Sequence, residues 1–170
     1  MHKRKHFNKE VIWLSLFVLL LTIVVRQGNR LFATAFNRVV FPSNMSIFEN
    51  FKVYFTSITL LVIFEYFIVF GYPNNYLLSR VVGALVMMGI TTIMLALYYW
   101  AGGRRLSILL LYAVNFFSII GGQAVSYLIQ RQKEYRLSLF LGLTQYLFIA
   151  SLIIILTSVT PSGFIFSWFR

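Results

Sequence analysis

The chain consists of long apolar runs separated by short polar or charged segments. Four of the runs have 20 or more residues, enough to cross roughly 30 Å of bilayer hydrocarbon as an α-helix. A fifth, shorter run near the N-terminus reaches that length because the basic side chains at its ends can extend toward the membrane surface. The runs are apolar on all sides rather than at alternate positions, which favours helices over barrel strands. The predicted spans are residues 11–26, 51–70, 81–100, 106–129 and 137–159.

Short connectors join the last four spans, so neighbours in sequence are expected to lie antiparallel in space. The connector after the first span is longer. Within it, Arg26, Arg30 and Arg38 fall on one side of a helical projection, and Phe32 and Phe36 fall on the other. This pattern predicts a short amphipathic helix at residues 29–41, lying at the membrane interface. It either covers one end of the bundle, binds lipid headgroups through the three arginines, or forms a lid over a cavity.

The predicted fold class is therefore all-α: a polytopic transmembrane helix bundle of five spans plus a short interfacial helix. Residues 1–170 are expected to form a single integral membrane domain. The composition agrees, because 59% of residues are hydrophobic and only 11% are charged, whereas a soluble domain is about a quarter charged. The absence of cysteine excludes a disulfide scaffold.

The charge is strongly positive, with 15 Lys and Arg against 4 acidic residues. In a soluble protein this excess would indicate nucleic-acid binding. Here the basic residues flank the spans, so the expected partners are the bilayer and its anionic lipids rather than nucleic acid. Five spans divide the basic residues almost evenly between the two membrane faces. The basic tail before the first span favours a cytoplasmic N-terminus in the cell membrane.

A helix start is predicted just before the second span. Ser46 and Glu49 have the spacing of a capping box, in which the serine hydroxyl accepts from the Glu49 amide and the Glu49 carboxylate returns to the Ser46 amide. Lys52 follows three residues later and can pair with Glu49. We therefore expect Ser46 and Glu49 to have a structural role.

The same region resembles a signature found in a family of small five-span bacterial membrane proteins, common in Gram-positive bacteria. Members typically read Pro-x-Asn-x-Ser-x-Trp-Glu-His-x-Lys before span two, and this chain has the pattern from Pro42 to Lys52 with Phe48 for Trp and Asn50 for His. Further matches are a Glu-Tyr-Phe late in span two, at 65–67, and a Tyr-Pro-Asn turn, at 72–74. The family also has a Pro before an apolar-Phe tail, which this chain matches with Pro161 and Phe166. The resemblance implies the five-span fold. It implies no activity, because the family's function is unknown.

Glu65 is the ionisable residue placed well inside a predicted span. A charge in hydrocarbon costs a few kcal/mol or more, so Glu65 should face the bundle or a wet cavity. It could be a neutral side chain hydrogen-bonded between helices, a ligand or proton site, or a residue near the interface that reaches water. Arg80 is the nearest basic residue in sequence beyond the following turn.

A stripe of small and polar residues follows one face of the fourth span: Asn115, Ser118, Gly122 and Ser126. Small residues allow close helix packing, and Asn and Ser supply hydrogen bonds between helices. The stripe either packs against a neighbouring helix or forms one wall of a polar pocket. In the second case Glu65 and Gln145 would complete the pocket with Asn115.

The sequence does not indicate a group of residues typical of a catalytic or metal-binding site. The two histidines, His2 and His6, lie in the N-terminal tail, and the chain has neither Cys nor Asp, so the sequence predicts no metal site, cofactor or catalytic triad. We expect an accessory, regulatory or lipid-interacting membrane component, with another membrane protein as a candidate partner. The alternative is a membrane subunit of a small-molecule transporter with a polar pocket near Glu65.

Overall fold

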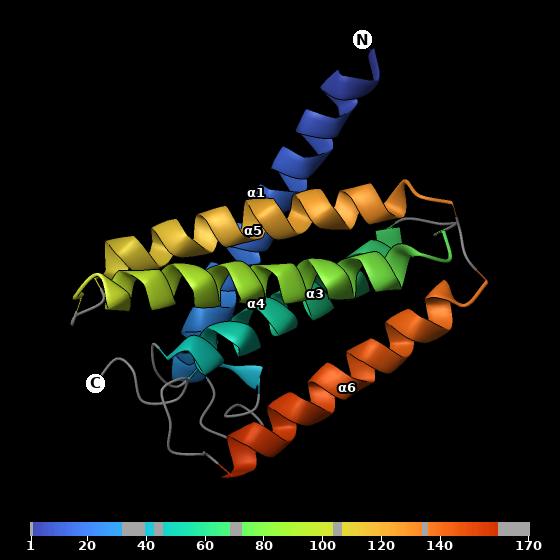
Figure 1. Cartoon of the computed structure of the whole chain (residues 1–170). Coiled ribbons are helices and arrows are strands. Elements are labelled where there is room, and N and C mark those ends of the chain that lie inside the picture. Colours follow the sequence, from blue (N-terminus) through green and yellow to red (C-terminus); the bar gives the residue numbers. More distant parts are fainter. Residues whose placement is uncertain are drawn as a thin grey trace.

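The computed structural model describes residues 2–31, 40–42, 46–68, 73–103, 107–133 and 136–159, most of them in helices. This part of the chain forms five helices, labelled as in Figure 1: α1 (His2–Leu31), α3 (Ile47–Ile68), α4 (Tyr76–Trp100), α5 (Ile108–Gln130) and α6 (Ser138–Val159). Each has a stretch long and apolar enough to cross a membrane. The predicted all-α, five-span character is confirmed for the described residues.

The predicted interfacial helix at residues 29–41 lies mostly outside the described residues. Its first three residues form the last turn of α1, which ends at Leu31, and residues 32–39 fall outside the described ranges. The prediction therefore stays a prediction. The helix α1 is also longer than its span, since its 30 residues correspond to about 45 Å.

Two helices begin earlier than the apolar runs indicate. The helix α3 starts at Ile47 rather than residue 51, directly after the predicted cap at Ser46, and α4 starts at Tyr76 rather than residue 81. Both added segments contain a buried charged residue, Glu49 in α3 and Arg80 in α4. Each of these charges has an oppositely charged partner, so the helix continues through it.

The helix α4 is at the centre of the arrangement, in contact with α3, α5 and α6, while α1 packs against α3 and α5. In Figure 1, α4 and α5 run side by side, α1 crosses behind them at a steep angle, and α6 diverges from the others toward its C-terminal end. The chain reverses direction between consecutive helices. One side of the bundle thus holds the starts of α3 and α5 and the C-terminal ends of α1, α4 and α6. These three ends lie near Arg26, Trp100 and Val159.

The close contact between α4 and α5 depends on two glycines. A Cβ added to Gly122 would lie 2.6 Å from the carbonyl oxygen of Gly83, and a Cβ on Gly83 would lie 3.0 Å from the carbonyl oxygen of Gly122. The two backbones therefore meet where neither residue has a side chain, as expected for small residues at membrane helix interfaces. The predicted stripe on span four is buried along its length.

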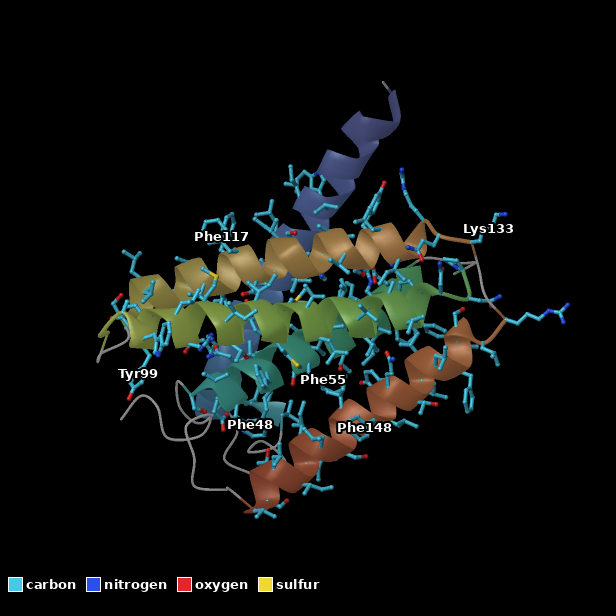
Figure 2. The ribbon with its side chains drawn as sticks, viewed as in Figure 1. Phe48, Phe55, Tyr99, Phe117, Lys133 and Phe148 are labelled. Carbon is cyan, nitrogen blue, oxygen red and sulfur yellow. The ribbon has the colours of Figure 1, made fainter. Side chains whose placement is uncertain are left out.

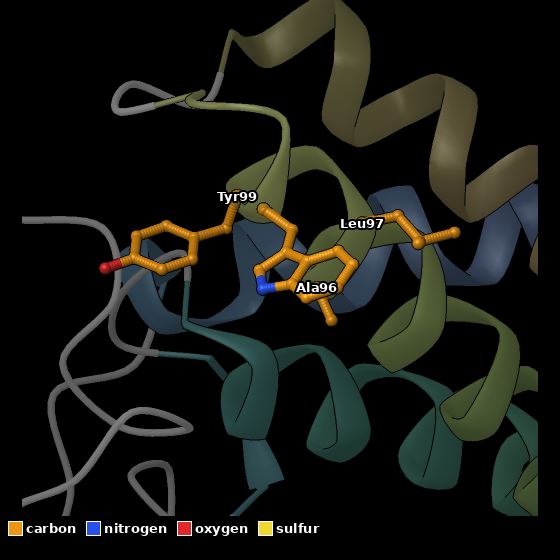
Figure 3. Close-up of a pocket in the computed structure, with 4 residues that line it drawn as sticks. Ala96, Leu97 and Tyr99 are labelled. Carbon is orange, nitrogen blue, oxygen red and sulfur yellow. The ribbon is translucent and has the colours of Figure 1, made fainter.

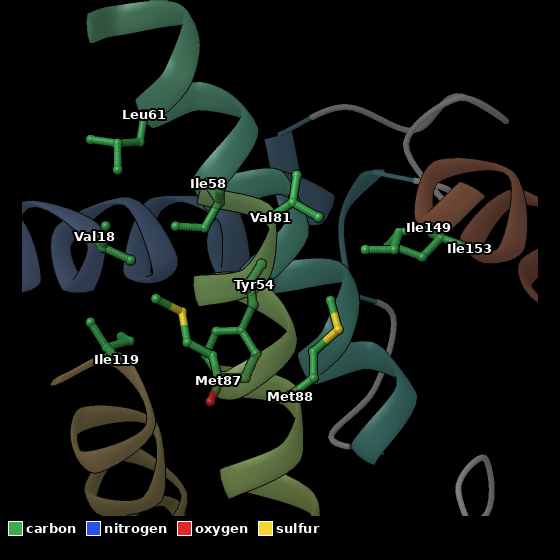
Figure 4. Close-up of a cluster of buried hydrophobic side chains, with 11 residues drawn as sticks. Val18, Tyr54, Ile58, Leu61, Val81, Met87, Met88, Ile119, Ile149 and Ile153 are labelled. Carbon is green, nitrogen blue, oxygen red and sulfur yellow. The ribbon is translucent and has the colours of Figure 1, made fainter. Parts of the chain in front are cut away.

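The main apolar core draws residues from all five helices (Figure 4). Val18 of α1, Ile58 of α3, Met87 of α4, Ile119 of α5 and Ile153 of α6 are all at most 5% exposed. A smaller cluster of Ile47, Leu95 and Val114 lies toward the other end of α4. These contacts hold the helices together around α4.

The outer surface is strongly apolar, as Figure 2 shows for its many outward side chains. Phe117 of α5 is 58% exposed and Phe148 of α6 is 67% exposed. Only 11% of the apolar stretch of α6 is buried, and its buried residues form a single stripe of Ser138, Gly142, Ile149 and Ile153. Such exposure is typical of surfaces that face lipid.

Candidate functional site

Glu65 forms a buried ion pair with Arg80, which joins α3 to α4. The Arg80 guanidinium donates from Nη2 to Glu65 Oε1 at 2.5 Å and from Nε to Glu65 Oε2 at 3.1 Å. This two-pronged geometry is the strong form of an arginine–carboxylate contact. The Arg80 side chain is 3% exposed and that of Glu65 is 18% exposed. Of the three interpretations of Glu65, the structure thus favours a side chain bonded between helices. The partner is the charged residue Arg80, whereas the interpretation expected a neutral Glu65.

Three more side chains surround this pair and extend it to α5. Arg80 Nη1 donates to Gln123 Oε1 at 3.0 Å and to Ser126 Oγ at 3.3 Å. The Tyr76 hydroxyl donates to Glu65 Oε2, and the Tyr76 ring lies 5.3 Å from the guanidinium carbon of Arg80. All three nitrogens of the guanidinium are therefore bonded within a cluster that connects α3, α4 and α5. We call these five residues the Arg80 cluster.

A second polar network lies deeper in the same three helices. The Tyr54 hydroxyl donates to Asn115 Oδ1 at 2.5 Å and lies 2.7 Å from Thr91 Oγ1, which is 2.8 Å from Ser118 Oγ. All four side chains are at most 2% exposed. We call them the Tyr54 network. Its hydroxyl and amide groups satisfy one another, which is required where no water is available.

The structure does not bring Glu65, Asn115 and Gln145 together. Glu65 belongs to the Arg80 cluster and Asn115 to the Tyr54 network; Asn115 is 11 residues from Ser126 along α5, which corresponds to about 16 Å. Gln145 is exposed on α6. The three residues therefore do not line a common pocket. The polar stripe of α5 packs against α4 instead.

The predicted cap of α3 has the expected contact, since the Glu49 amide donates to Ser46 Oγ at 3.2 Å. The Glu49 carboxylate pairs with Lys52 Nζ at 2.8 Å, and Lys52 also lies over the Phe48 ring. Lys52 is only 1% exposed, so its charge needs this partner.

Of the three arginines predicted to bind lipid, the structure describes the side chain of Arg26. It is partly buried near the C-terminal end of α1, and its Nη2 donates to Asn50 Oδ1 in the first turn of α3. The side chain of Arg30 and the whole of Arg38 lie outside the described part of the structure.

A shallow pocket of about 330 Å³ lies at the C-terminal end of α4, lined by Ala96, Leu97, Tyr99 and Trp100 (Figure 3). Trp100 is 90% exposed. Aromatic side chains at the end of a span are typical of the membrane–water interface. The pocket lies 20 residues along α4 from Arg80, or about 30 Å, and so is remote from Glu65.

Several members of these networks were not predicted from the sequence. Glu65, Arg80 and Asn115 were noted, but Gln123 was not predicted as a partner of Arg80. Nor were Tyr54 and Thr91 predicted as members of the network that contains Asn115. One signal was present: Tyr76 precedes Arg80 by four residues, so the two share a helix face and can meet the same partner. No sequence signal shows which residues of other helices complete the networks, because those contacts depend on how the helices are packed.

Together these features define a multi-pass membrane protein in which two polar clusters connect α3, α4 and α5. Comparison with protein-family models, with curated proteins and with solved structures finds no match to this chain. The resemblance to the five-span bacterial family therefore stays a prediction.

Proposed function

We propose that this chain acts by binding within the cell membrane, as an accessory or regulatory subunit or as a lipid-interacting component. One observation carries the proposal: two groups of polar side chains inside the spans, the Arg80 cluster and the Tyr54 network, are bonded across α3, α4 and α5. Glu65 is held by Arg80 and Tyr76, and Asn115 by Tyr54. Groups bonded in this way stabilise a bundle and are less available to a passing substrate.

The apolar exterior supports the same proposal. The helix α6 contacts mainly α4 and leaves most of its surface outward. Such a surface suits lipid chains or the helix of another membrane protein, with van der Waals packing as the driving force. The basic residues of α1 that precede its apolar stretch support a cytoplasmic N-terminus as part of the proposal.

The second candidate is a membrane subunit of a small-molecule transporter with its site near Glu65. Two observations favour it. The Glu65 side chain keeps 18% exposure, and Gln123 Nε2, in the same cluster, is buried without a hydrogen-bond partner among the described residues. A polar ligand could use that donor if it entered beside Glu65.

Purification in native lipid, followed by mass spectrometry of what is retained, tests the proposal. We expect a lipid or a membrane protein at near-stoichiometric ratio, recovered equally from wild type and from Glu65→Gln that remains folded. Gln145→Leu, at an exposed position of α6, is the matched control. Retention of only a small polar molecule that is lost in Glu65→Gln would favour the transporter subunit and contradict the binding proposal.

A further inference from the structure

We infer that Arg26 forms a binding site for a phosphate group at the junction of α1 and α3. This inference deepens the proposed function, because it names the chemistry and the place of a lipid contact. It begins with an imbalance of charge. Arg26 is partly buried at the end of the α1 span, and its charge has no carboxylate partner among the described residues.

The chain itself offers Arg26 almost no counter-charge, since it contains four glutamates and no aspartate. Glu49 pairs with Lys52 at 2.8 Å. Glu65 pairs with Arg80, 15 residues along α3 from Asn50, or about 22 Å. Glu10 is 16 residues away along α1, or about 24 Å. The fourth, Glu134, lies outside the described part of the chain.

Arg26 is also oriented in a way that leaves donor capacity for a ligand. Asn50 Oδ1 accepts from Nη2, and the Asn50 amide is itself fixed because its Nδ2 donates to the Ser46 carbonyl at 3.0 Å. Asn50 thus orients the guanidinium without neutralising it. The Nε atom is buried and has no hydrogen-bond partner among the described residues. The guanidinium therefore keeps an unused donor at Nε, and its planar set of donors matches the oxygens of a phosphate.

The depth of Arg26 agrees with this ligand. It follows directly after the apolar run that ends at Val25 and lies within the last turn of the Val11–Gly28 span. Phospholipid phosphates lie at this level of a bilayer, and anionic headgroups are attracted to basic residues there. The ligand chemistry is therefore a phosphate, carried by an anionic phospholipid headgroup or free in solution.

The test measures binding of phosphatidylglycerol to the full chain by native mass spectrometry, with phosphatidylcholine as the neutral comparison. We expect Arg26→Gln to lower the apparent affinity for phosphatidylglycerol about tenfold, the loss expected for a charge-assisted hydrogen bond. Arg131→Gln is the matched control, because Arg131 is an exposed arginine at the other end of the bundle, stacked on Tyr127. It should bind like wild type.

Asn50→Asp supplies an internal counter-charge at the atom that already accepts from Arg26. It should reduce phosphatidylglycerol binding as strongly as Arg26→Gln while keeping the arginine. Arg26→Lys keeps the charge but lacks the fork, so an intermediate affinity is expected. Circular-dichroism melting of each variant verifies that the helices are retained, and the Asn50→Asp and Arg26→Lys results decide the case if Arg26→Gln fails to fold.

Inorganic phosphate in neutral detergent distinguishes the two sources. If phosphate raises the melting temperature of wild type but not of Arg26→Gln, and no selective lipid binding is seen, the ligand is free phosphate. If binding is selective for phosphatidylglycerol, the ligand is the lipid headgroup. Unchanged binding of both probes in Arg26→Gln and Asn50→Asp overturns the inference. So does loss of a co-purifying protein from Arg26→Gln with lipid binding intact, which would assign a partner's carboxylate. The protein could also retain neither lipid nor protein from native membranes and still bind phosphate through Arg26. That result would contradict the proposed function but not the inference about Arg26.

Discussion

At the scale of single residues, the guanidinium of Arg80 determines how three helices meet. It bonds to Glu65 on α3 and to Gln123 and Ser126 on α5 from its own position on α4. The side chain is almost fully buried, so its charge depends on the carboxylate. Removing one member of a buried pair leaves the other charge uncompensated, which costs more than the pair itself contributes.

We therefore expect Glu65→Gln to lower the free energy of unfolding by about 3 kcal/mol. The double variant Glu65→Gln with Arg80→Met should recover at least half of that loss, because it removes both charges together. Thermal unfolding in detergent, followed by circular dichroism, measures the effect. Equal stability of wild type and Glu65→Gln would mean that Arg80 gains no stability from its partner.

The Tyr54 network gives a second prediction at this scale. Tyr54→Phe removes the hydroxyl that bonds to Asn115 and Thr91 and leaves the Asn115 carbonyl without its donor. We expect a loss of about 1–2 kcal/mol in unfolding free energy. Tyr66→Phe is the matched control on the same helix, because Tyr66 is 70% exposed; it should change stability by less than about 0.5 kcal/mol. Equal effects in both variants would argue against the network.

The candidate site could be predicted in part from the sequence. Glu65 stands out because an ionisable residue in a span needs a partner, and the capping contact of Ser46 follows from local spacing. The partners Gln123 and Thr91 could not be found, because an uncharged polar residue in a span gives no sign of which helix it faces. Arg26 was predicted to bind lipid headgroups with Arg30 and Arg38, and its sequence position did not reveal the approach of Asn50.

At the scale of helices, the closest packing occurs between α4 and α5 at Gly83 and Gly122. A methyl group at Gly122 would lie 2.4 Å from the Met87 Cγ and 2.6 Å from the Gly83 carbonyl oxygen. The side chain of Met87 can move, but the backbone oxygen can do so only if the helices separate. Separation would stretch the Thr91–Ser118 bond and the contacts of Arg80 to α5.

Gly122→Ala should therefore destabilise the bundle by about 1–3 kcal/mol, the usual cost of overpacking. Gly89→Ala is the matched control on α4, because a Cβ there meets nothing within 4 Å. Alanine has the higher helix propensity, so Gly89→Ala should be neutral or stabilising by up to about 1 kcal/mol. Comparison of the two melting temperatures in one detergent decides the case. A stable Gly122→Ala would mean that α4 and α5 can repack at this crossing.

Helix boundaries show the limit of hydropathy. The apolar runs correctly place all five helices, because length and hydrophobicity are properties of each segment alone. They begin α4 after Arg80, whereas the structure begins it at Tyr76. A hydropathy profile counts Arg80 as a polar end, but its pairing with Glu65 places it inside the bundle. The ion pair is a contact between two segments, which no single-segment measure contains.

At the scale of the whole molecule, the charge and the polar contacts are arranged by the antiparallel order of the helices. The Arg80 cluster lies near the side that holds the start of α1, and Arg26, Asn50 and Lys52 lie near the opposite side. The Tyr54 network lies between them. Each membrane face thus has a buried polar layer beneath it, while α6 presents an apolar surface to the bilayer. Two glutamates stabilise buried cations, and Arg26 is the cation for which we propose an external anion.

The topology gives the last prediction, which the absence of native cysteine makes simple to test. Ala101 and Gln132 are both exposed, in the turns after α4 and α5, and these turns lie on opposite sides of the bundle. With a cytoplasmic N-terminus, Ala101→Cys should face outward and react in intact cells with a membrane-impermeant maleimide. Gln132→Cys should react only after the cells are permeabilised. The reverse pattern would invert the proposed orientation. Reaction of both cysteines in intact cells would contradict a single membrane crossing by α5, the one described helix between the two turns.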